Sequence, residues 1–278
     1  MFEAFRYDGK HAVVVGGATG MGAATAALAL DAGAQVTVMD RAEVTLDGVK
    51  AINVDLSDPR SIDAAIDQCG GPVNALFSCA GVADGTPGID KINFIGHRYM
   101  IDSLRARQML PRGSAIGFIS SAAGLGWQAN LPHIIEYLDT PDFASAVAWI
   151  DEHQGADYIL SAYMWSKQTI CAYVARQAFP FLKDGIRINA ICPGPTDTPL
   201  AQANKEMWLG FGSDYREVLG IEPSAPIEQA YPLVFLCSGA ASAITGITLI
   251  ADEGYISSGV TGSFPPATDI SRFLLGLS

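Results

Sequence analysis

Residues 11–22 read HAVVVGGATGMG, and an alanine-rich stretch, AATAALALDAG, follows at 23–33. An apolar strand, a glycine turn and a helix in that order are typical of the first unit of a parallel α/β sheet. The glycines let the backbone turn sharply and approach a pyrophosphate, which the N–H groups of the helix N-terminus can then bind. The segment therefore predicts a dinucleotide site at Gly16, Gly20 and Gly22, and an ordinary tight turn is the alternative.

Six further short apolar runs follow along the chain, separated by longer segments with helical periodicity. Together with 11–15, the expected strands lie at 35–39, 50–54, 74–78, 115–119, 186–191 and 246–250. This alternation predicts the α/β class, as a single-domain Rossmann-type fold with a doubly wound parallel sheet over residues 1–278. No Pro/Gly/Ser linker divides the chain, so we expect one domain to hold both cofactor and substrate.

The composition excludes several classes of protein. With 49% hydrophobic and 17% charged residues, the chain is too apolar to be disordered. Its net charge of −12, without a basic cluster, argues against nucleic acid as a partner. The uncharged stretches 12–30 and 230–251 contain the glycines and small residues of buried strand-turn-helix units, so we expect no membrane association.

Cysteine and histidine positions bear on compartment and metal binding. Five cysteines, at 69, 79, 171, 192 and 237, form no CxxC pair, which suits reduced thiols better than a disulfide framework. The four histidines are dispersed, so no catalytic metal is expected. Residues 1–11 contain no apolar core of a secretory signal. These features predict a cytoplasmic protein.

Two acidic residues follow predicted strands. Asp40 lies 20 positions after Gly20, where a carboxylate can accept hydrogen bonds from an adenosine ribose and repel a 2′-phosphate. This favours NAD over NADP, although Arg41 could accommodate the phosphate of NADP, and Asp40 could simply be a solvated turn residue. Asp55, after the third strand, is expected to contact the adenine amine or to cap a helix.

Tyr163 is the only one of nine tyrosines with a lysine, Lys167, four positions later. On a helix the two side chains share a face. A free phenol titrates at about pH 10, and a neighbouring ammonium favours the phenolate. We therefore expect Lys167 to lower the pKa of Tyr163 and make it a general acid/base. A surface pair on a helix is the alternative.

The assembled motifs resemble the classical short-chain dehydrogenase/reductase family over residues 8–256. The matching residues, in the family's order, are Gly16, Gly20, Gly22, Ala80, Gly81, Asn93, Ser121, Tyr163, Lys167, Pro193, Gly194, Thr196 and Thr198. One departure is Ser78-Cys79 before Ala80, where the family has two asparagines. The resemblance implies that all of these matching residues except Asn93 and Ser121 contact the cofactor, with Thr19, Met21, Asp40, Arg41, Asp55 and Leu56.

The resemblance also implies an activity, which is NAD-dependent hydride transfer between a secondary alcohol and a ketone, or an aromatic alcohol and an aldehyde. Ser121 would hydrogen-bond the substrate oxygen, Tyr163 would exchange its proton, and Lys167 would bind the nicotinamide ribose. Asn93 would support a water relay to Lys167. Without such roles, Ser121 would be a strand-end serine and Asn93 would mark a helix kink.

Two other classes of function compete with this assignment. Nucleotide-sugar epimerases also use Tyr and Lys, but their glycine pattern is GxxGxxG, whereas residues 16–22 read GxxxGxG. A non-catalytic dinucleotide-binding sensor could share the fold. The complete Ser, Tyr, Lys and Asn set argues against a sensor.

Tyr163 comes 42 positions after Ser121, because residues 128–158 form an insertion with helical signals at Thr140 and Pro141. This length resembles the hydroxysteroid dehydrogenase/carbonyl reductase and coniferyl alcohol dehydrogenase branches of the family. It implies a small apolar alcohol or ketone such as a 3-hydroxysteroid, with a small non-steroid carbonyl compound as the alternative. The residues expected to wall an apolar pocket, unless they pack against one another or against a partner subunit, are Trp127, Ile134, Ile135, Tyr137, Leu138, Met207, Trp208, Leu209 and Phe211.

The insertion also bears on assembly. Typical members of the family form tetramers partly through the helices that carry Asn93 and Tyr163. An inserted helix with Phe143, Val147 and Ile150 on one face needs an apolar surface to cover it and would obstruct that contact. We therefore expect a homodimer through another surface, such as the C-terminal strand and the tail at 257–278.

Overall fold

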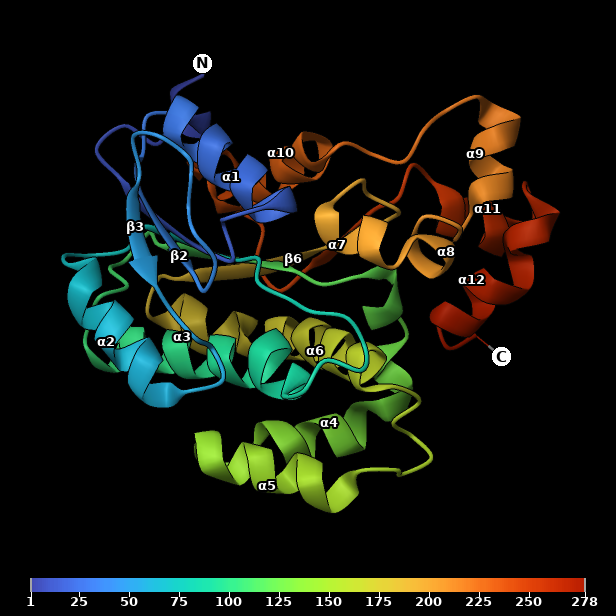
Figure 1. Cartoon of the computed structure of the whole chain (residues 1–278), viewed down its shortest axis with the longest axis horizontal. Coiled ribbons are helices and arrows are strands. Elements are labelled where there is room, and N and C mark those ends of the chain that lie inside the picture. Colours follow the sequence, from blue (N-terminus) through green and yellow to red (C-terminus); the bar gives the residue numbers. More distant parts are fainter. Residues whose placement is uncertain (1, 278) are drawn as a thin grey trace.

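The computed structural model of the chain describes residues 2–277 (Figure 1). Seven strands form one parallel sheet in the order β3-β2-β1-β4-β5-β6-β7. They are β1 His11–Val15, β2 Gln35–Asp40, β3 Lys50–Asn53, β4 Ala75–Ser78, β5 Ala115–Ile119, β6 Arg187–Pro193 and β7 Thr248–Ala251. The predicted doubly wound α/β sheet is therefore confirmed, and each expected strand is present with its ends shifted by no more than two residues.

Helices cover both faces of the sheet. On one face lie α1 Gly20–Asp31 and α10 Pro226–Cys237, and on the other α2 Pro59–Cys69, α3 Gly96–Ala106 and α6 Ala162–Lys183 (Figure 1). Successive residues of β1 face opposite layers, since Val13 packs with the α2, α3 and α6 core and Val14 with the α1 and α10 core. This two-sided burial explains why the strands are continuous apolar runs.

Shorter turns connect these elements. One turn at the start of α3, η2 Lys91–Ile95, is π-helical. The 3-10 turns are η1 Glu3–Phe5, η3 Ala122–Gly124, η4 Trp127–Asn130, η5 Gly239–Ala241 and η6 Pro265–Ala267. Within residues 2–277, no helix combines the length and hydropathy needed to cross a membrane.

The insertion forms two helices, α4 Leu131–Leu138 and α5 Phe143–His153, which lie outside α3 and α6 as an extra layer (Figure 1). The predicted start of α5 at Thr140 and Pro141 is wrong. Asp142 is the N-cap, and its carboxylate accepts the Ser145 N–H at 2.8 Å. Thr140 is engaged elsewhere, because its hydroxyl donates to the Tyr137 carbonyl at 2.7 Å.

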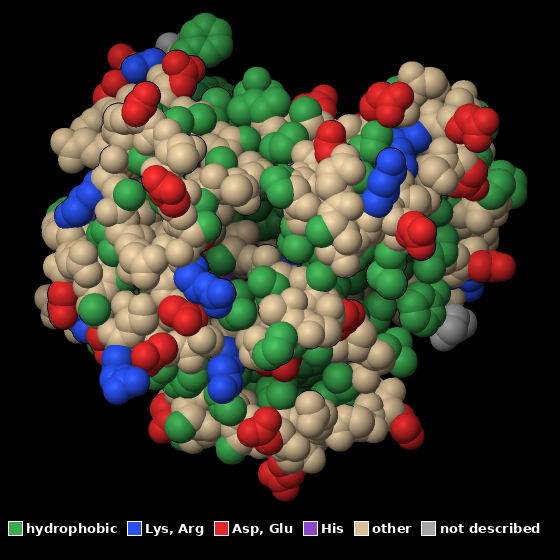
Figure 2. Space-filling view, in the orientation of Figure 1, with side chains coloured by type: hydrophobic (Ala, Val, Ile, Leu, Met, Phe, Trp, Pro, Cys, Tyr) green, Lys and Arg blue, Asp and Glu red, His purple; other side chains and the backbone are tan. Residues whose placement is uncertain are grey.

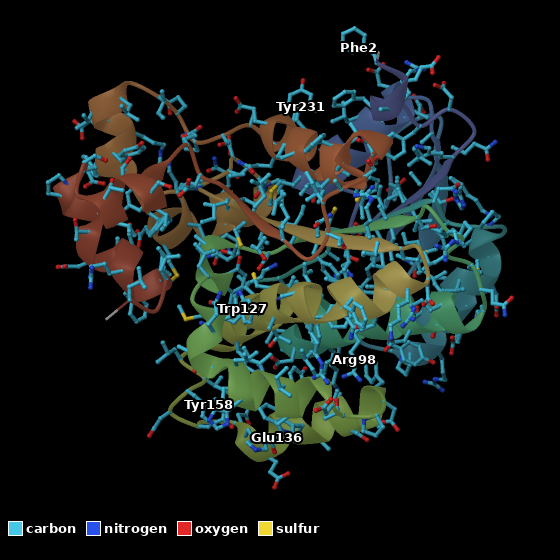
Figure 3. The ribbon with its side chains drawn as sticks, turned by 180° about the vertical axis from the view of Figure 1, so that it is seen from behind. Phe2, Arg98, Trp127, Glu136, Tyr158 and Tyr231 are labelled. Atoms are coloured by element: carbon cyan, nitrogen blue, oxygen red, sulfur yellow. The ribbon has the colours of Figure 1, made fainter. Side chains whose placement is uncertain are left out.

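Aromatic stacking and two arginines hold the insertion in place. The Trp149 ring of α5 stacks on Trp165 of α6, with 5.5 Å between ring centroids and 9° between planes. Arg98 of α3 donates to the Thr140 hydroxyl at 2.9 Å and lies between the layers (Figure 3). Arg176 of α6 donates to the Ile135 carbonyl at 3.3 Å. The insertion is therefore packed against the main domain.

The remaining helices gather at one end of the sheet (Figure 1). They are α7 Pro199–Ala203, α8 Lys205–Trp208, α9 Ser213–Leu219, α11 Tyr255–Thr261 and α12 Thr268–Leu274. The tail after α12 packs against the loop that follows β5, where a Cβ at Gly126 would lie 2.6 Å from the Leu274 carbonyl oxygen. The chain can make this approach because Gly126 carries no side chain and has φ +67°.

Replacing Trp149 with alanine tests the packing of the insertion. We expect Trp149→Ala to lower the free energy of unfolding by about 3 to 5 kcal/mol, because the ring is buried and leaves a cavity against Trp165. Leu160→Ala is the control, since this side chain is 64% exposed and should change stability by less than about 0.5 kcal/mol. Urea unfolding measures both. If both variants lost the same small free energy of unfolding, the insertion would not be packed as described.

Candidate functional site

The loops that follow β1, β4, β5 and β6 meet at one edge of the sheet, because these strands are parallel. A cavity of about 470 Å³ opens there, and the space-filling view shows this face hollowed near its middle (Figure 2). Of the predicted site residues, the cavity brings together Met21, Gly81, Ser121, Tyr163, Lys167, Pro193, Gly194, Thr196 and Thr198. The other predicted residues do not line this cavity: Gly16, Thr19, Gly20, Gly22, Asp40, Arg41, Asp55, Leu56, Ala80 and Asn93.

The glycine turn is a backbone-on-backbone contact. A Cβ at Gly22 would lie 1.9 Å from the Gly16 carbonyl oxygen, and a Cβ at Gly16 would lie 2.4 Å from the Cα of Ala80. Thr19, the N-cap of α1, makes no side-chain capping hydrogen bond. The first N–H groups of α1, at the glycine turn, therefore have no capping side chain and can bind a pyrophosphate.

Asp40 is fixed beside this turn. Its Oδ2 accepts the Ala18 N–H and its Oδ1 accepts the Ala42 N–H, each at 2.9 Å. A carboxylate oxygen has two lone pairs, so both oxygens can still accept ribose hydroxyls. Arg41, the next residue, is exposed. The turn and the carboxylate together fit the adenosine half of a dinucleotide.

Asp55 and Leu56 have structural partners of their own. Asp55 Oδ1 accepts both the N–H and the hydroxyl of Ser57, at 2.8 and 2.6 Å, and the Ser57 hydroxyl contributes most to lowering the pKa of Asp55. Asp58, and not Asp55, is the N-cap of α2. The Leu56 side chain is buried in the core next to α3. A dinucleotide could therefore meet Leu56 only through its backbone.

Tyr163 and Lys167 lie one turn apart near the start of α6, which Ser161 caps by accepting the Met164 N–H at 3.0 Å. Lys167 Nζ lies 5.6 Å from the centroid of the Tyr163 ring and donates to the Ile119 carbonyl at 3.0 Å. Ser121 follows β5 and lines the same cavity, and its hydroxyl lowers the pKa of Tyr163. Two elements distant in sequence thus bring a serine, a tyrosine and a lysine to one cavity.

Asn93 lies behind the cavity in the π-helical turn η2. Its Oδ1 accepts the Val82 N–H at 2.8 Å, and its Nδ2 donates to the Val82 carbonyl at 3.1 Å and to the Ser166 hydroxyl at 3.2 Å. A Cβ at Gly81 would lie 3.5 Å from both Asn93 Oδ1 and Lys167 Nζ. Asn93 thereby joins α3, α6 and the loop after β4, and it does mark a distortion of the helix.

Burial controls the protonation of the central pair. It raises the pKa of Tyr163 to about 12, against a smaller lowering by the Ser121 hydroxyl. It lowers the pKa of Lys167 to about 8. The pKa of Tyr163 therefore lies above its ordinary value, and not below it as expected from the Lys167 spacing, because loss of hydration is the largest contribution. At neutral pH the phenol is protonated.

The cavity walls differ from those expected. Met207, Trp208 and Phe211 line the cavity as predicted, and the Trp208 ring lies 5.1 Å from the Tyr163 ring. The other expected wall residues are absent from its lining: Trp127, Ile134, Ile135, Tyr137, Leu138 and Leu209. The side chains of Ile134, Tyr137 and Leu138 pack into the core over α3 and α6 instead. For these three expected wall residues of the insertion, the alternative given above is therefore the one found, since they pack in the core and do not line the cavity.

The tail supplies a wall that the sequence analysis missed. Ile270, Phe273 and Leu274 of α12 line the cavity, and apolar side chains gather over α8 and α12 on the surface (Figure 2). Their spacing of three and four residues indicates one apolar helix face. That pattern could have shown that α12 buries this face, but not that it does so over the cavity.

Comparisons with known proteins agree with this geometry. Residues 10–133 match the family model described as short chain dehydrogenase, and residues 146–256 match the one described as enoyl-(acyl carrier protein) reductase. The residues between the two matches lie within the insertion.

Three individual proteins are similar to the chain over nearly its whole length. Coniferyl-alcohol dehydrogenase of Pseudomonas sp. (strain HR199) is 30% identical, over 89% of this chain and 97% of that protein. The 3-alpha-hydroxysteroid dehydrogenase/carbonyl reductase of Comamonas testosteroni is 29% identical, over 87% and 95%. The solved structure of 3-alpha-hydroxysteroid dehydrogenase from Pseudomonas sp. B-0831 complexed with NADH has a TM-score of 0.71 and 28% identity, over 92% of this chain and 99% of that chain.

The buried ammonium of Lys167 predicts a pH-dependent effect on stability. Its pKa is about 8 in the folded chain and ordinarily 10.5, so the unfolded chain binds more protons between these values and the wild type gains stability as pH rises through them. Lys167→Met removes this gain. The free energy of unfolding of the variant minus that of the wild type should be about 2 to 3 kcal/mol more positive near pH 7 than near pH 10.

Urea unfolding of both chains at the two pH values measures this difference. Tyr163 is present in both chains, so its own titration cancels. A stability difference that does not change with pH would show that Lys167 is not desolvated as described.

Proposed function

The chain belongs to the short-chain dehydrogenase/reductase family and is an oxidoreductase of alcohols and carbonyl compounds; we propose that it uses NAD and acts on an apolar substrate. The predicted resemblance to the family, and to its hydroxysteroid and coniferyl alcohol branches, is confirmed by the comparisons. The observation that carries the proposal is the convergence of Ser121, Tyr163 and Lys167 on one cavity whose other side begins at the glycine turn.

Each residue of this set has a distinct task in the proposed reaction. A nicotinamide bound beside Gly194 and Thr198 would supply or accept the hydride. Ser121 donates a hydrogen bond to the substrate oxygen, where negative charge develops during reduction. Tyr163, held protonated by burial, gives its proton to that oxygen and takes it back in the reverse direction. Lys167 would hold the nicotinamide ribose and carry the proton onward.

Asp40 supports the choice of NAD as cofactor. The carboxylate is fixed at the end of β2 by two backbone N–H groups, where it can accept the ribose hydroxyls of NAD. A 2′-phosphate at the same place would meet like charge at short range. The related Pseudomonas sp. B-0831 enzyme is described in complex with NADH, which agrees with this assignment.

The walls of the cavity support an apolar substrate. Met207, Trp208, Phe211 and Phe273 contribute large apolar side chains, and a volume of about 470 Å³ is within the range of small-molecule sites. The names of two relatives, coniferyl-alcohol dehydrogenase and 3-alpha-hydroxysteroid dehydrogenase/carbonyl reductase, refer to substrates that contain rings. We therefore favour a ring-bearing alcohol or ketone over a small carbonyl compound.

We also propose a homodimer. The faces of α3 and α6 that would pack between subunits in a tetramer are covered by α4 and α5 (Figure 1). β7 is an edge strand of the sheet. Among the described residues it pairs only with β6, and its Leu249 is 36% exposed. Phe179 of α6 is 70% exposed and follows Ala178, which packs against Gly246, two residues before β7 begins. These features favour association through β7.

Replacing Tyr163 with phenylalanine tests the catalytic assignment. We expect Tyr163→Phe to lower kcat by at least about a hundredfold, because the ring still packs but the transferable proton is gone. The Kd of NADH, measured by fluorescence, should change less than about twofold. Tyr158→Phe is the matched control outside the cavity. Substantial kcat in Tyr163→Phe would refute the role of the phenol.

Replacing Asp40 with alanine tests cofactor choice. The wild type should prefer NAD over NADP, and Asp40→Ala should narrow or reverse this preference because the repulsion of the 2′-phosphate is removed. The measurement is kcat/KM for both cofactors in both proteins. A native preference for NADP would indicate that Arg41 dominates.

Light scattering at micromolar concentration tests the assembly. We expect a particle of two chains, or about twice the 29.3 kDa of one chain. Leu249→Lys should shift the particle towards one chain, because it places a charge on the exposed edge of β7. A stable tetramer with α3 and α6 at its interface would contradict the proposed arrangement.

A further inference from the structure

The N-terminus of α6 opens onto the cavity and is already occupied by groups of this chain. The Tyr163 N–H donates to Asp84 Oδ1 at 2.8 Å, and the Met164 N–H donates to the Ser161 hydroxyl at 3.0 Å. Asp84 and Ser161 both line the cavity. A helix N-terminus ordinarily favours the carboxylate of a ligand. Here a carboxylate of the protein itself takes that place.

The remaining charges of the cavity give an anionic ligand no partner. Among the described residues that line it, only Asp84 and Lys167 are charged at neutral pH. Lys167 is directed to the Ile119 carbonyl and to the Tyr163 ring, at the reacting end. The walls away from that end are apolar or carry hydroxyl groups. A carboxylate placed there would meet Asp84 and no cation.

The charge of Asp84 also reaches the reacting group. Burial is the main cause that raises the pKa of Tyr163 to about 12, and the negative charge of Asp84 adds a smaller contribution in the same direction. Asp84 is therefore close enough to the phenol for its field to act within the cavity. Its own side chain is exposed, so water and salt moderate this field.

We propose that Asp84 determines which substrates the enzyme accepts by charge, so that neutral alcohols and ketones are admitted and those bearing a carboxylate are excluded. This inference rests on the proposed function and names its substrate class. Two physical effects contribute: Asp84 repels an anion, and it occupies the Tyr163 N–H that an anion would otherwise bind. Because Asp84 is exposed, the discrimination is about three- to tenfold for each effect.

The test compares two ligands of nearly the same shape. Cyclohexanecarboxamide is neutral and cyclohexanecarboxylate is charged, and calorimetry gives the Kd of each for the enzyme saturated with NADH. In the wild type the carboxylate should bind more weakly than the amide. Asp84→Asn keeps an oxygen for the Tyr163 N–H but removes the charge, so the ratio of the carboxylate Kd to the amide Kd should fall about three- to tenfold.

A second variant separates the two effects. Asp84→Ala also exposes the Tyr163 N–H, so the carboxylate should gain more affinity there than in Asp84→Asn. Raising the ionic strength from about 0.05 M to about 0.5 M should reduce the discrimination in the wild type and leave that of Asp84→Asn unchanged. Asp157→Asn, an exposed aspartate outside the cavity lining, is the control for net charge.

The outcomes are distinct. If Asp84 were only a helix cap, both ligands would weaken together in Asp84→Ala and their ratio would stay constant in Asp84→Asn, which would overturn the inference. An equal change of the ratio in Asp157→Asn would also overturn it, since any surface carboxylate would then suffice.

Turnover separates this inference from the proposed function. The substrates are methyl 4-oxocyclohexanecarboxylate and 4-oxocyclohexanecarboxylate, each with NADH. Reduction of both at equal kcat/KM in the wild type would refute selection by charge and leave the proposed function standing. Absence of reduction across these and other ketones, with the ligand ratio still responding to Asp84→Asn, would refute the proposed function and leave selection by charge standing.

Discussion

The contact of Gly22 with the Gly16 carbonyl, where a Cβ would lie 1.9 Å from the oxygen, determines how the whole edge of the sheet is built. It fixes the start of α1 directly over the end of β1. The same turn closes on Ala80, so that the loop after β4 lies against it, and the Ala18 N–H holds Asp40 of β2 in reach. The ends of three neighbouring strands, β2, β1 and β4, are thereby held together, and side chains that need a fixed distance from one another can be placed on the loops that follow.

The site also depends on a buried lysine whose loss of hydration is offset by few hydrogen bonds. Lys167 is 4% exposed, and among residues 2–277 its ammonium has one hydrogen bond, to the Ile119 carbonyl at the end of β5. Desolvation makes this arrangement costly for the folded state. It also links α6 to the strand that carries Ser121 at its end, so the unfavourable burial and the alignment of serine and tyrosine arise from the same side chain. Stability and chemistry oppose each other here, as is common where groups are preorganised.

Local signals in the sequence predicted most of the fold and the centre of the site. Continuous apolar strands and the glycine turn are local patterns, and the spacing of Tyr163 and Lys167 is a property of a single helix. The role of the insertion could not be predicted in the same way, because the spacing of Phe143, Val147 and Ile150 indicates that a face is buried but not which surface covers it. For the same reason α12 was missed as a wall of the cavity. The pKa of Tyr163 depended on three-dimensional burial, which the Lys167 spacing alone does not report.

Three of the four tryptophans of the chain form two separate optical reporters. Trp149 and Trp165 lie with rings almost parallel, 5.5 Å apart between centroids, between the insertion and the main domain, whereas Trp208 lies at the cavity next to Tyr163. A stacked indole pair couples its electronic transitions, so the near-ultraviolet circular dichroism of the chain contains a signal of the docked insertion. The emission of Trp208 responds instead to what enters the cavity. Spectroscopy on the unlabelled protein can therefore follow the docking of the extra layer and the occupancy of the site as separate events.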